Sequence, residues 1–407
     1  MNQQELFASA LGLEQPWYIE SIDFIPGVSW LEGSMTIKLS FVRGTKFPGS
    51  DGNFYTAYDT TERKWQHLNF FQHKCFLIAP APRIMLPNGK TEMVELPWTR
   101  EGSHFTLFFE AFAMMLIERE MPISKVAKLM NVHDGAIRRI FNYHIAKALK
   151  TQDLSTLGSM GVDETSVKKG HNYVTVAVDL ETREVIHVTD GKDKQTLKAV
   201  KEHLIAQNGK PEQVKHLSMD MSPAFIAGAQ EHFPSASITF DKFHVVKLIN
   251  KAMDDTRRTE QAGCKALKGT RYSWLKNDEN LEPDQIKLRT ELAESFPRLG
   301  EAYRMKVQFN TFWTEESPAK AKIFLEEWCR KATFSGLKHF ENVAITITKH
   351  LEGIVEHIST KINNGILEGI NSKIQLAKKR ARGYRNMDNF KAMIYYLCAD
   401  LKLNLPM

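Results

Sequence analysis

The chain has 407 residues, 43% of them hydrophobic and 25% charged, and its formal net charge is +6. This is the composition of an ordinary globular protein with room for two or three sizeable cores, and its mild positive charge suits a polyanionic partner without requiring one. The four cysteines are widely spaced and form no Cys-x-x-Cys pair, which argues against a disulfide framework or a thiolate zinc site and fits a reducing compartment.

The sequence gives no reason to expect a membrane partner. The N-terminus lacks the basic and apolar pattern of a signal peptide. The apolar run from Phe105 to Ile117 is broken by Glu110 and is too short to span a bilayer. We therefore expect a soluble cytoplasmic protein.

Residues 1–100 predict a small β-rich module. Aromatic and β-branched residues are frequent there, and Met35 to Phe41 alternates between apolar and polar positions, as a half-buried strand does. Turn sequences rich in Pro and Gly lie at 48–52 and at 86–89.

Residues 101–155 change to a helical period and predict a helix-turn-helix. Ser124 can cap a short helix, a tight turn follows, and a second helix opens at Gly135. The second helix of such a motif enters the major groove of DNA, and the exposed pair Arg138 and Arg139 favours DNA contact. A plain three-helix packing unit is the alternative.

Residues 156–245 predict the first part of a mixed α/β sheet. The segments follow the order β-β-β-α-β-α-β, which is a strand meander extended by parallel strands with crossover helices. Three of the predicted strands lie between Met160 and Asp190, the later strands lie at 214–219 and 236–241, and the helices lie at 192–207 and 223–232.

Residues 246–358 show no strong strand signal and predict an all-helical insertion that interrupts the sheet. The stretch from Lys265 to Lys276 mixes basic residues with aromatic ones. We interpret it as a contact with DNA or, for Trp274, as a position in the helical core.

Residues 359–407 complete the core with a helix and a basic tail. Asn363 or Asn364 caps the helix, and its polar stripe includes Glu368 and Asn371. The tail predicts phosphate contacts, with an aromatic ring able to stack on a base or sugar, although a solvated basic helix end is the alternative. The residues of this predicted contact are Lys378, Lys379, Arg380, Arg382, Tyr384 and Arg385.

Three carboxylates occur along this topology in an order that suits metal-dependent chemistry. Asp163 and Asp220 end two predicted strands, and Glu368 lies one turn into a helix that can pack beside them. Hard divalent cations such as Mg²⁺ take oxygen ligands, and two ions about 4 Å apart can activate an attacking oxygen and stabilise the leaving oxygen of a phosphodiester. We therefore predict that these three side chains converge.

Asp241 and His244 lie at and just past the end of the fifth predicted strand. They can support the site from behind the carboxylates, or His244 can contact DNA. A packing role for both residues is the alternative.

Several short motifs carry a resemblance that runs from the first predicted core strand to near the C-terminus. They are Val162-Asp163-Glu164, His171-Asn172-Tyr173 with Asp179, Ser218 to Ser222, Phe240 to Val246, Asn364-Gly365 with Glu368 to Asn371, and Arg382 to Asn386. In this combination the chain resembles the insertion-sequence transposases of the DDE type, and most closely the ISL-three group, with an RNase-H-like catalytic core.

The resemblance implies a DNA transposase in which Asp163, Asp220 and Glu368 match the catalytic triad. Such an enzyme binds the terminal inverted repeats of its element, cleaves the strands, and joins the freed 3′-hydroxyl to target DNA by transesterification. It implies two Mg²⁺ or Mn²⁺ ions, with Asp163 bridging both and the other two acids each holding one. It also implies a homodimer or larger assembly on double-stranded DNA, because two ends must be joined together.

One departure from the group concerns the N-terminal module. Relatives carry Cys-Pro zinc knuckles where this chain has Phe47 to Ser50 and Leu86 to Gly89, so no zinc is expected. We expect the module to fold through aromatic packing of Phe54, Tyr55, Trp65, Phe70 and Phe71. Two alternative functions stay open: a non-catalytic DNA-binding protein derived from a transposase, and an RNase-H-like nuclease without strand transfer.

Overall fold

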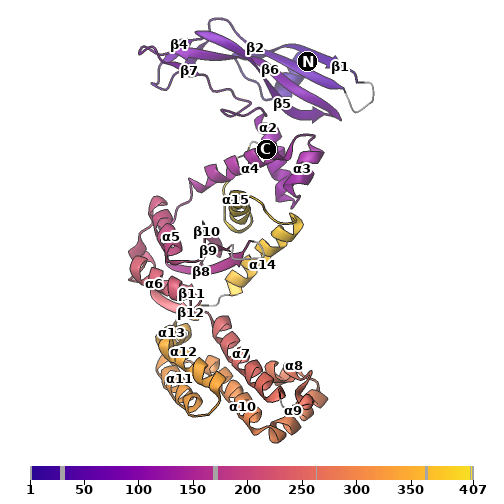
Figure 1. Ribbon diagram of the computed structural model, residues 1–407. Helices are drawn as coiled ribbons and strands as arrows, with labels where there is room; N and C mark the ends of the chain where they lie inside the picture. The colour runs from indigo at the N-terminus through magenta and orange to yellow at the C-terminus, as the bar shows by residue number, and fades with distance from the viewer. Residues whose placement is uncertain are drawn as a thin grey trace. The chain divides into compact units, whose positions relative to one another are not determined.

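The computed structural model describes residues 2–27, 33–167, 173–262, 264–362, 365–403 and 405 (Figure 1). It divides into two compact units, Met1–His144 with Leu403–Met407, and Ile145–Lys402. The motif residues His171 and Asn172 and the predicted caps Asn363 and Asn364 lie outside the described residues. The finer division into five segments stays a prediction.

A β-sheet built around tryptophan side chains opens the first unit. Its strands run in the order β1-β2-β6-β5, with β7 paired to β6 and a separate β3-β4 ribbon. The rings of Trp17 and Trp65 both meet Trp98 edge-on, with centroids 4.7 and 5.8 Å apart. The elements are α1 (Gln3–Ala10), β1 (Trp17–Ile25), β2 (Ser34–Phe41), β3 (Lys46–Pro48), β4 (Phe54–Thr56), β5 (Asp59–Phe70), β6 (His73–Met85) and β7 (Thr91–Met93).

The predicted aromatic core of this module is only partly correct. Trp65 is buried, but Phe54 is 63% exposed and Phe71 is 82% exposed. Phe70 and Phe71 lie where β5 turns into β6, and Phe71 has a φ of 51°, so the turn directs its ring away from the sheet. The core forms instead from residues that alternate inward along the strands, such as Ile37 and Leu39 of β2.

Three helices complete the first unit: α2 (Leu107–Glu118), α3 (Ile123–Leu129) and α4 (Asp134–Leu149), the last of which continues into the second unit. Thr106 caps α2 by accepting a hydrogen bond from the Phe109 amide. The predicted cap of α3 at Ser124 is wrong, because α3 begins at Ile123 after Pro122, whose ring fixes the φ that leads into the first turn. A tight turn separates α3 from α4, as in a helix-turn-helix.

The second unit contains a five-stranded mixed sheet in the order β10-β9-β8-β11-β12. β9 pairs antiparallel with β8 and β10, whereas β11 runs parallel to β8 and β12. A three-stranded meander extended by two parallel strands is the RNase-H-like arrangement, which confirms the predicted fold class. The strands are β8 (Ser159–Ser166), β9 (Tyr173–Asp179), β10 (Glu184–Asp190), β11 (His216–Met219) and β12 (Ser237–Phe240).

Helices cover both faces of this sheet (Figure 1). Val162 of β8 belongs to the same apolar cluster as Leu197 and Val200 of α5, so α5 packs on that face. Gly161 and Thr165 alternate to the opposite face, where α14 contacts them. The covering helices are α5 (Lys194–Ala206), α6 (Pro223–His232), α14 (Gly365–Arg380) and α15 (Met387–Cys398).

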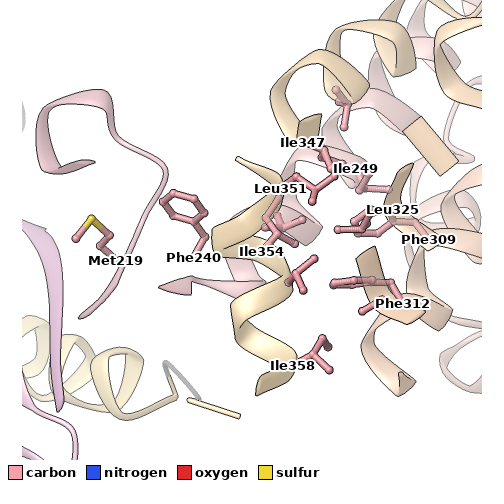
Figure 2. Packing of buried hydrophobic residues seen from close by; sticks show 14 of the residues in the cluster. Met219, Phe240, Ile249, Phe309, Phe312, Leu325, Ile347, Leu351, Ile354 and Ile358 are labelled. Carbon is pink, nitrogen blue, oxygen red and sulfur yellow. The ribbon is translucent and has the colours of Figure 1, made fainter. Parts of the chain in front are cut away.

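An all-α insertion lies between β12 and α14, as predicted. Its apolar interior is continuous with the sheet through Phe240, which packs beside Ile354 of α13 (Figure 2). Trp274 is fully buried and donates a hydrogen bond to Thr270, so its predicted core position is confirmed and a direct DNA contact by this ring is excluded. The helices are α7 (Lys242–Gln261), α8 (Arg271–Leu275), α9 (Pro283–Ser295), α10 (Pro297–Thr311), α11 (Pro318–Thr333), α12 (Lys338–Lys349) and α13 (Leu351–Thr360). Over the described residues, no helix combines the length and apolar character needed to cross a bilayer.

Candidate active site

The side chains of Asp163 and Asp220 stand at matched positions along two neighbouring parallel strands. Asp163 lies within β8, which continues to Ser166 and therefore does not end at this aspartate as predicted, whereas Asp220 directly follows the last residue of β11. Gly161 of β8 is the register partner of Ser218 of β11, and each aspartate follows two residues later. Because side chains alternate along a strand, matched positions on parallel neighbours face the same side of the sheet. The fold therefore brings these two carboxylates together.

Asp163 is a partly buried carboxylate with few compensating contacts. It accepts hydrogen bonds from the Glu164 amide at 2.8 Å and from Asn371 Nδ2 at 2.7 Å. Burial raises the pKa of Asp163 above its usual range and the charge of Asp220 adds to the rise, while these hydrogen bonds and the field of His244 offset only part of it. A carboxylate in this environment gains from a nearby cation.

Helix α14 is held along β8 by a series of contacts. The Leu367 side chain packs on Gly161, where a Cβ atom would lie 3.1 Å from Leu367 Cδ1. One and two turns further on, Asn371 binds Asp163 and Gln375 Nε2 donates to Thr165 Oγ1 at 2.9 Å. The polar stripe predicted for this helix thus faces the strand that carries the first aspartate.

Glu368 lies in the first turn of α14 and is exposed. It precedes Asn371 by three positions, and residues three apart share a helix face, so Glu368 lies on the side of the helix that binds Asp163. Among the residues that the structure describes, no three His, Cys, Asp or Glu side chains are close enough to hold one metal ion. The convergence of all three acids on one ion therefore stays a prediction.

Asp241 and His244 flank the aspartates at the start of α7. The buried Asp241 side chain accepts a hydrogen bond from the Phe243 amide at 2.9 Å and lies 3.0 Å from His244 Nδ1. The hydrogen bond to Asp241 raises the pKa of His244, and the charges of Asp241, Asp220 and Asp163 add to the rise. His244 thus supplies a positive field to the two aspartates, and Asp241 orients it.

The basic end of α14 is only partly available to a ligand. Lys379, Arg380, Arg382 and Arg385 are exposed. Lys378 Nζ donates to the Ser166 carbonyl at 2.8 Å, which ties it to β8. The predicted stacking of Tyr384 on a base is corrected, because its ring is 8% exposed and packs on Phe390 with centroids 5.1 Å apart.

In the helix-turn-helix, Arg139 of α4 is exposed and Arg138 is half-buried beside Asp134 at 3.4 Å.

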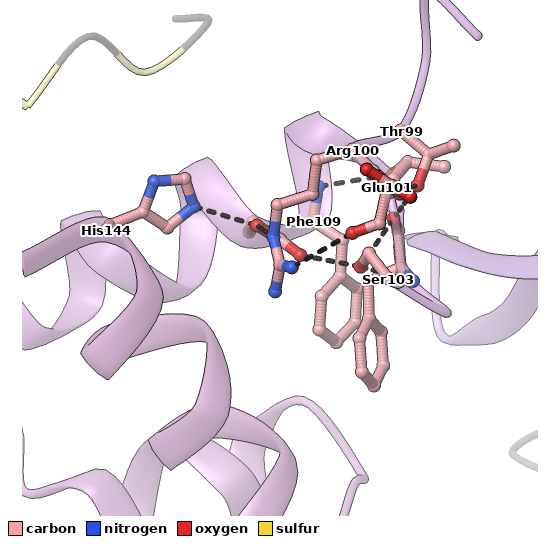
Figure 3. A network of polar contacts seen from close by, with 9 residues as sticks. Thr99, Arg100, Glu101, Ser103, Phe109 and His144 are labelled. Atoms are coloured by element: carbon pink, nitrogen blue, oxygen red, sulfur yellow. Dashed lines mark hydrogen bonds and ion pairs between the residues drawn. The ribbon is translucent and has the colours of Figure 1, made fainter. Parts of the chain in front are cut away.

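A polar network fixes the other end of α4 (Figure 3). Glu110 of α2 is fully buried and binds His144 Nε2 at 2.7 Å, Ser103 Oγ at 2.6 Å and Arg100 Nε at 2.9 Å. The network joins α2 to α4 and so sets the angle between them.

Sequence reasoning noted Glu110 only as a break in an apolar run and gave it no role. The available signal was a lone acid on the apolar stripe of a helix, since a carboxylate is buried in such a place only when it is paired. Its partners were not readable, because His144 lies 34 positions away.

The sheet, the paired aspartates and the helix that lies against β8 define a protein of the DDE class with an RNase-H-like core. A family model described as "Transposase" matches residues 160–394, and a model of the helix-turn-helix domain of transposase family ISL3 matches residues 94–145. The chain belongs to the ISL3 transposase family. The predicted family and the predicted helix-turn-helix are thereby confirmed.

Two relatives are insertion-sequence transposases. The transposase for insertion sequence element IS1001 of Bordetella parapertussis is 26% identical over 343 residues, which cover 82% of this chain and 84% of the relative. The transposase for IS1557 of Mycobacterium tuberculosis is 26% identical over 441 aligned positions, covering 100% of this chain and 98% of the relative.

Two solved structures overlap only weakly with this chain. The catalytic core domain of BIV integrase covers 34% of this chain and 99% of its own at 21% identity, with a TM-score of 0.16. The simian T-cell lymphotropic virus intasome covers 44% of this chain and 66% of its own at 13% identity, with a TM-score of 0.17.

Proposed function

We propose that this protein is a DNA transposase that cleaves DNA at the ends of its element and joins each freed 3′-hydroxyl to target DNA. The observation that carries the proposal is the matched placement of Asp163 and Asp220 on adjacent parallel strands, with α14 bound across β8 beside them. Membership of the ISL3 family, over most of the core and the helix-turn-helix, supports it.

The donor set fits hard divalent cations. Asp163, Asp220 and Glu368 offer only oxygen atoms, which Mg²⁺ and Mn²⁺ prefer, and the pKa of Asp163 is raised by burial that its neighbours do not fully offset. These three side chains would hold the ions. When bound, two such ions supply activation of the attacking oxygen and stabilisation of the leaving oxygen.

The other residues act on the substrate and on the carboxylates. Asn371 orients Asp163 through its amide, and the Asp241–His244 pair supplies positive charge behind the site. The exposed basic residues in the last turn of α14 and just after it neutralise DNA phosphates, and Arg139 of α4 contacts the terminal repeat. Joining of two ends requires at least two copies of the chain on DNA.

The proposal is tested by strand cleavage and joining with Mg²⁺ or Mn²⁺ and DNA that carries the element ends. Asp163→Asn is expected to lower cleavage by at least about 10²–10³-fold, because charge stabilisation at the reacting phosphate is lost, with DNA binding changed less than about twofold. Glu202→Gln, an exposed acid on α5, is the matched control and keeps full cleavage. Magnesium-dependent cleavage retained in Asp163→Asn contradicts the proposal.

One observation favours a second candidate, a DNA-binding protein without catalysis. Glu368 is exposed, and no metal-holding triplet exists among the described residues. The same experiment separates the candidates. Nicks at defined ends with joined products support the transposase, binding without nicks supports the non-catalytic protein, and nicks without joining support a nuclease.

A further inference from the structure

The first turn of α7 presents an aromatic ring and a cation next to the candidate active site. Phe243 is 55% exposed and is flanked along the chain by the exposed Lys242 and by His244. The Phe243 amide is capped by the Asp241 carboxylate at 2.9 Å, so the turn offers side chains to a ligand and not its backbone amides.

Phe243 is connected to the two aspartates through His244 and through the start of α7. Its ring meets the His244 ring edge-on, with centroids 5.7 Å apart, and the charges of Asp220 and Asp163 act on His244. The Asp241 amide also donates to the Met219 carbonyl at 3.0 Å, which ties the start of α7 to the strand that ends at Asp220. Phe243 therefore contacts the ring of a histidine on which the charges of both aspartates act.

Lys242 precedes Phe243 in the chain, as His244 follows it. Its ammonium is 5.1 Å from the centroid of the Trp313 ring, within the reach of a cation–π contact. Trp313 thereby holds the long Lys242 side chain near the start of α7. The exposed Phe243 ring thus has a lysine before it and a histidine after it in the chain.

This arrangement fits a single DNA strand. Proteins that bind unpaired strands stack bases on aromatic rings and neutralise the adjoining phosphates with cations. A base inside a duplex is already stacked on both faces, so only an unpaired base can use the Phe243 ring. We propose that Phe243 and Lys242 form a subsite for one unpaired nucleotide next to the cleaved phosphodiester, an inference that rests on the proposed function.

Exposure of one phenylalanine is common and proves nothing by itself. Phe334 is more exposed, at 83%, and lies at the far end of the sixteen-residue helix α11, about 24 Å along its axis from the end that follows Trp313. Phe334→Ala is therefore a matched control for loss of an exposed ring.

The experiment compares cleavage of a fully paired element end with cleavage of the same end carrying two unpaired bases at the cut. Phe243→Ala is expected to cleave the paired end about 10–100-fold more slowly than the unaltered protein, because the ring no longer stabilises the unstacked base. On the end with two unpaired bases, the fold-decrease in cleavage rate caused by Phe243→Ala is expected to be at least tenfold smaller than on the paired end. Phe243→Trp is expected to cleave the paired end as fast as the unaltered protein does. Phe334→Ala is expected to leave the cleavage rates of both the paired and the unpaired end unchanged. Equal losses on both ends, or no loss, overturn the subsite.

A binding measurement separates this inference from the proposed function. A fluorescent adenine analogue at the unpaired position reports stacking without cleavage. The unaltered protein and Phe334→Ala are expected to quench it, and Phe243→Ala is not. Quenching that depends on Phe243, in a protein that cleaves no DNA, keeps the subsite and removes the transposase proposal. If the protein cleaves DNA and Phe243→Ala quenches the analogue as much as Phe334→Ala does, the transposase proposal stands and the subsite is removed.

Lys242 has its own readout. Removal of one phosphate contact lowers the slope of log affinity against log salt concentration by about one. Lys242→Ala is expected to show this change with the unpaired end, whereas Lys251→Ala, further along α7 and paired with Asp255, is not. An unchanged slope in Lys242→Ala removes this residue from the subsite.

Discussion

Two carboxylates in this protein, the fully buried Glu110 and the partly buried Asp163, have opposite environments. For Glu110, burial alone raises the pKa, but hydrogen bonds from His144, Ser103 and Arg100 outweigh it and hold the pKa below its usual range. For Asp163, burial also raises the pKa, and its two hydrogen bonds do not compensate.

The difference separates a structural acid from a candidate functional one. Glu110 is fully satisfied within the chain and joins two helices. Burial disfavours the charged form of Asp163, and a cation supplied from outside the chain would offset that effect. An incompletely compensated carboxylate of this kind is typical of functional sites, which often lower the stability of the fold.

Removal of Glu110 should give the largest effect on stability. Glu110→Ala leaves Arg100 and His144 without their buried partner and is expected to destabilise the fold by about 3 kcal/mol. That corresponds to a fall of about 10 °C in the melting temperature of the first unit, measured by calorimetry of the full chain. Glu118→Ala, an exposed acid at the end of the same helix, is the control and stays within about 0.5 kcal/mol. Equal melting of both variants contradicts a structural role for the network.

Addition of metal should distinguish the two acids by its effect on the melting temperature, which is expected to depend on Asp163 and not on Glu110. A ligand that binds only the folded state at a hundred times its dissociation constant stabilises by about 2.7 kcal/mol. Millimolar Mn²⁺ is expected to raise the melting temperature of the unaltered protein and of Glu110→Ala, but not of Asp163→Asn. A metal-induced rise that persists in Asp163→Asn shows that the ion binds elsewhere.

The pH dependence should give the smallest effect, with opposite signs for the two acids. The stability contributed by Glu110 is fully present above its ordinary pKa of 4.5 and is lost as pH falls through its lowered pKa in the folded state. For Asp163, whose pKa is raised in the folded state, the contribution to stability is fully present when the pH is below the ordinary pKa of 3.8. This contribution is lost as the pH rises through the raised pKa of the folded state.

The measurement is the melting-temperature difference between the unaltered protein and Glu110→Gln, or Asp163→Asn, in metal-free buffers from about pH 3 to 6. The first difference should grow with rising pH and the second should shrink. Slopes of the same sign in both series would mean that the contrast between the two carboxylates is not real.

The sequence by itself determined the order of the core elements and singled out the two aspartates, although only Asp220 lies at a strand end and β8 continues past Asp163 to Ser166. Alternation along a strand and periodicity along a helix are local properties, so the meander from Met160 to Asp190 and the helices of the insertion were readable without a partner. The family could be recognised because its motifs are short and lie along this order.

Only the tertiary structure decided which side chains face which. The register of β8 and β11 aligns Asp163 with Asp220, and the packing of α14 on Gly161 puts Asn371 on Asp163 from 208 positions away. Packing against Phe390 of α15 buries Tyr384, which local pattern had placed at the DNA. Contacts between residues far apart in the chain depend on the closed core, and no local pattern encodes them.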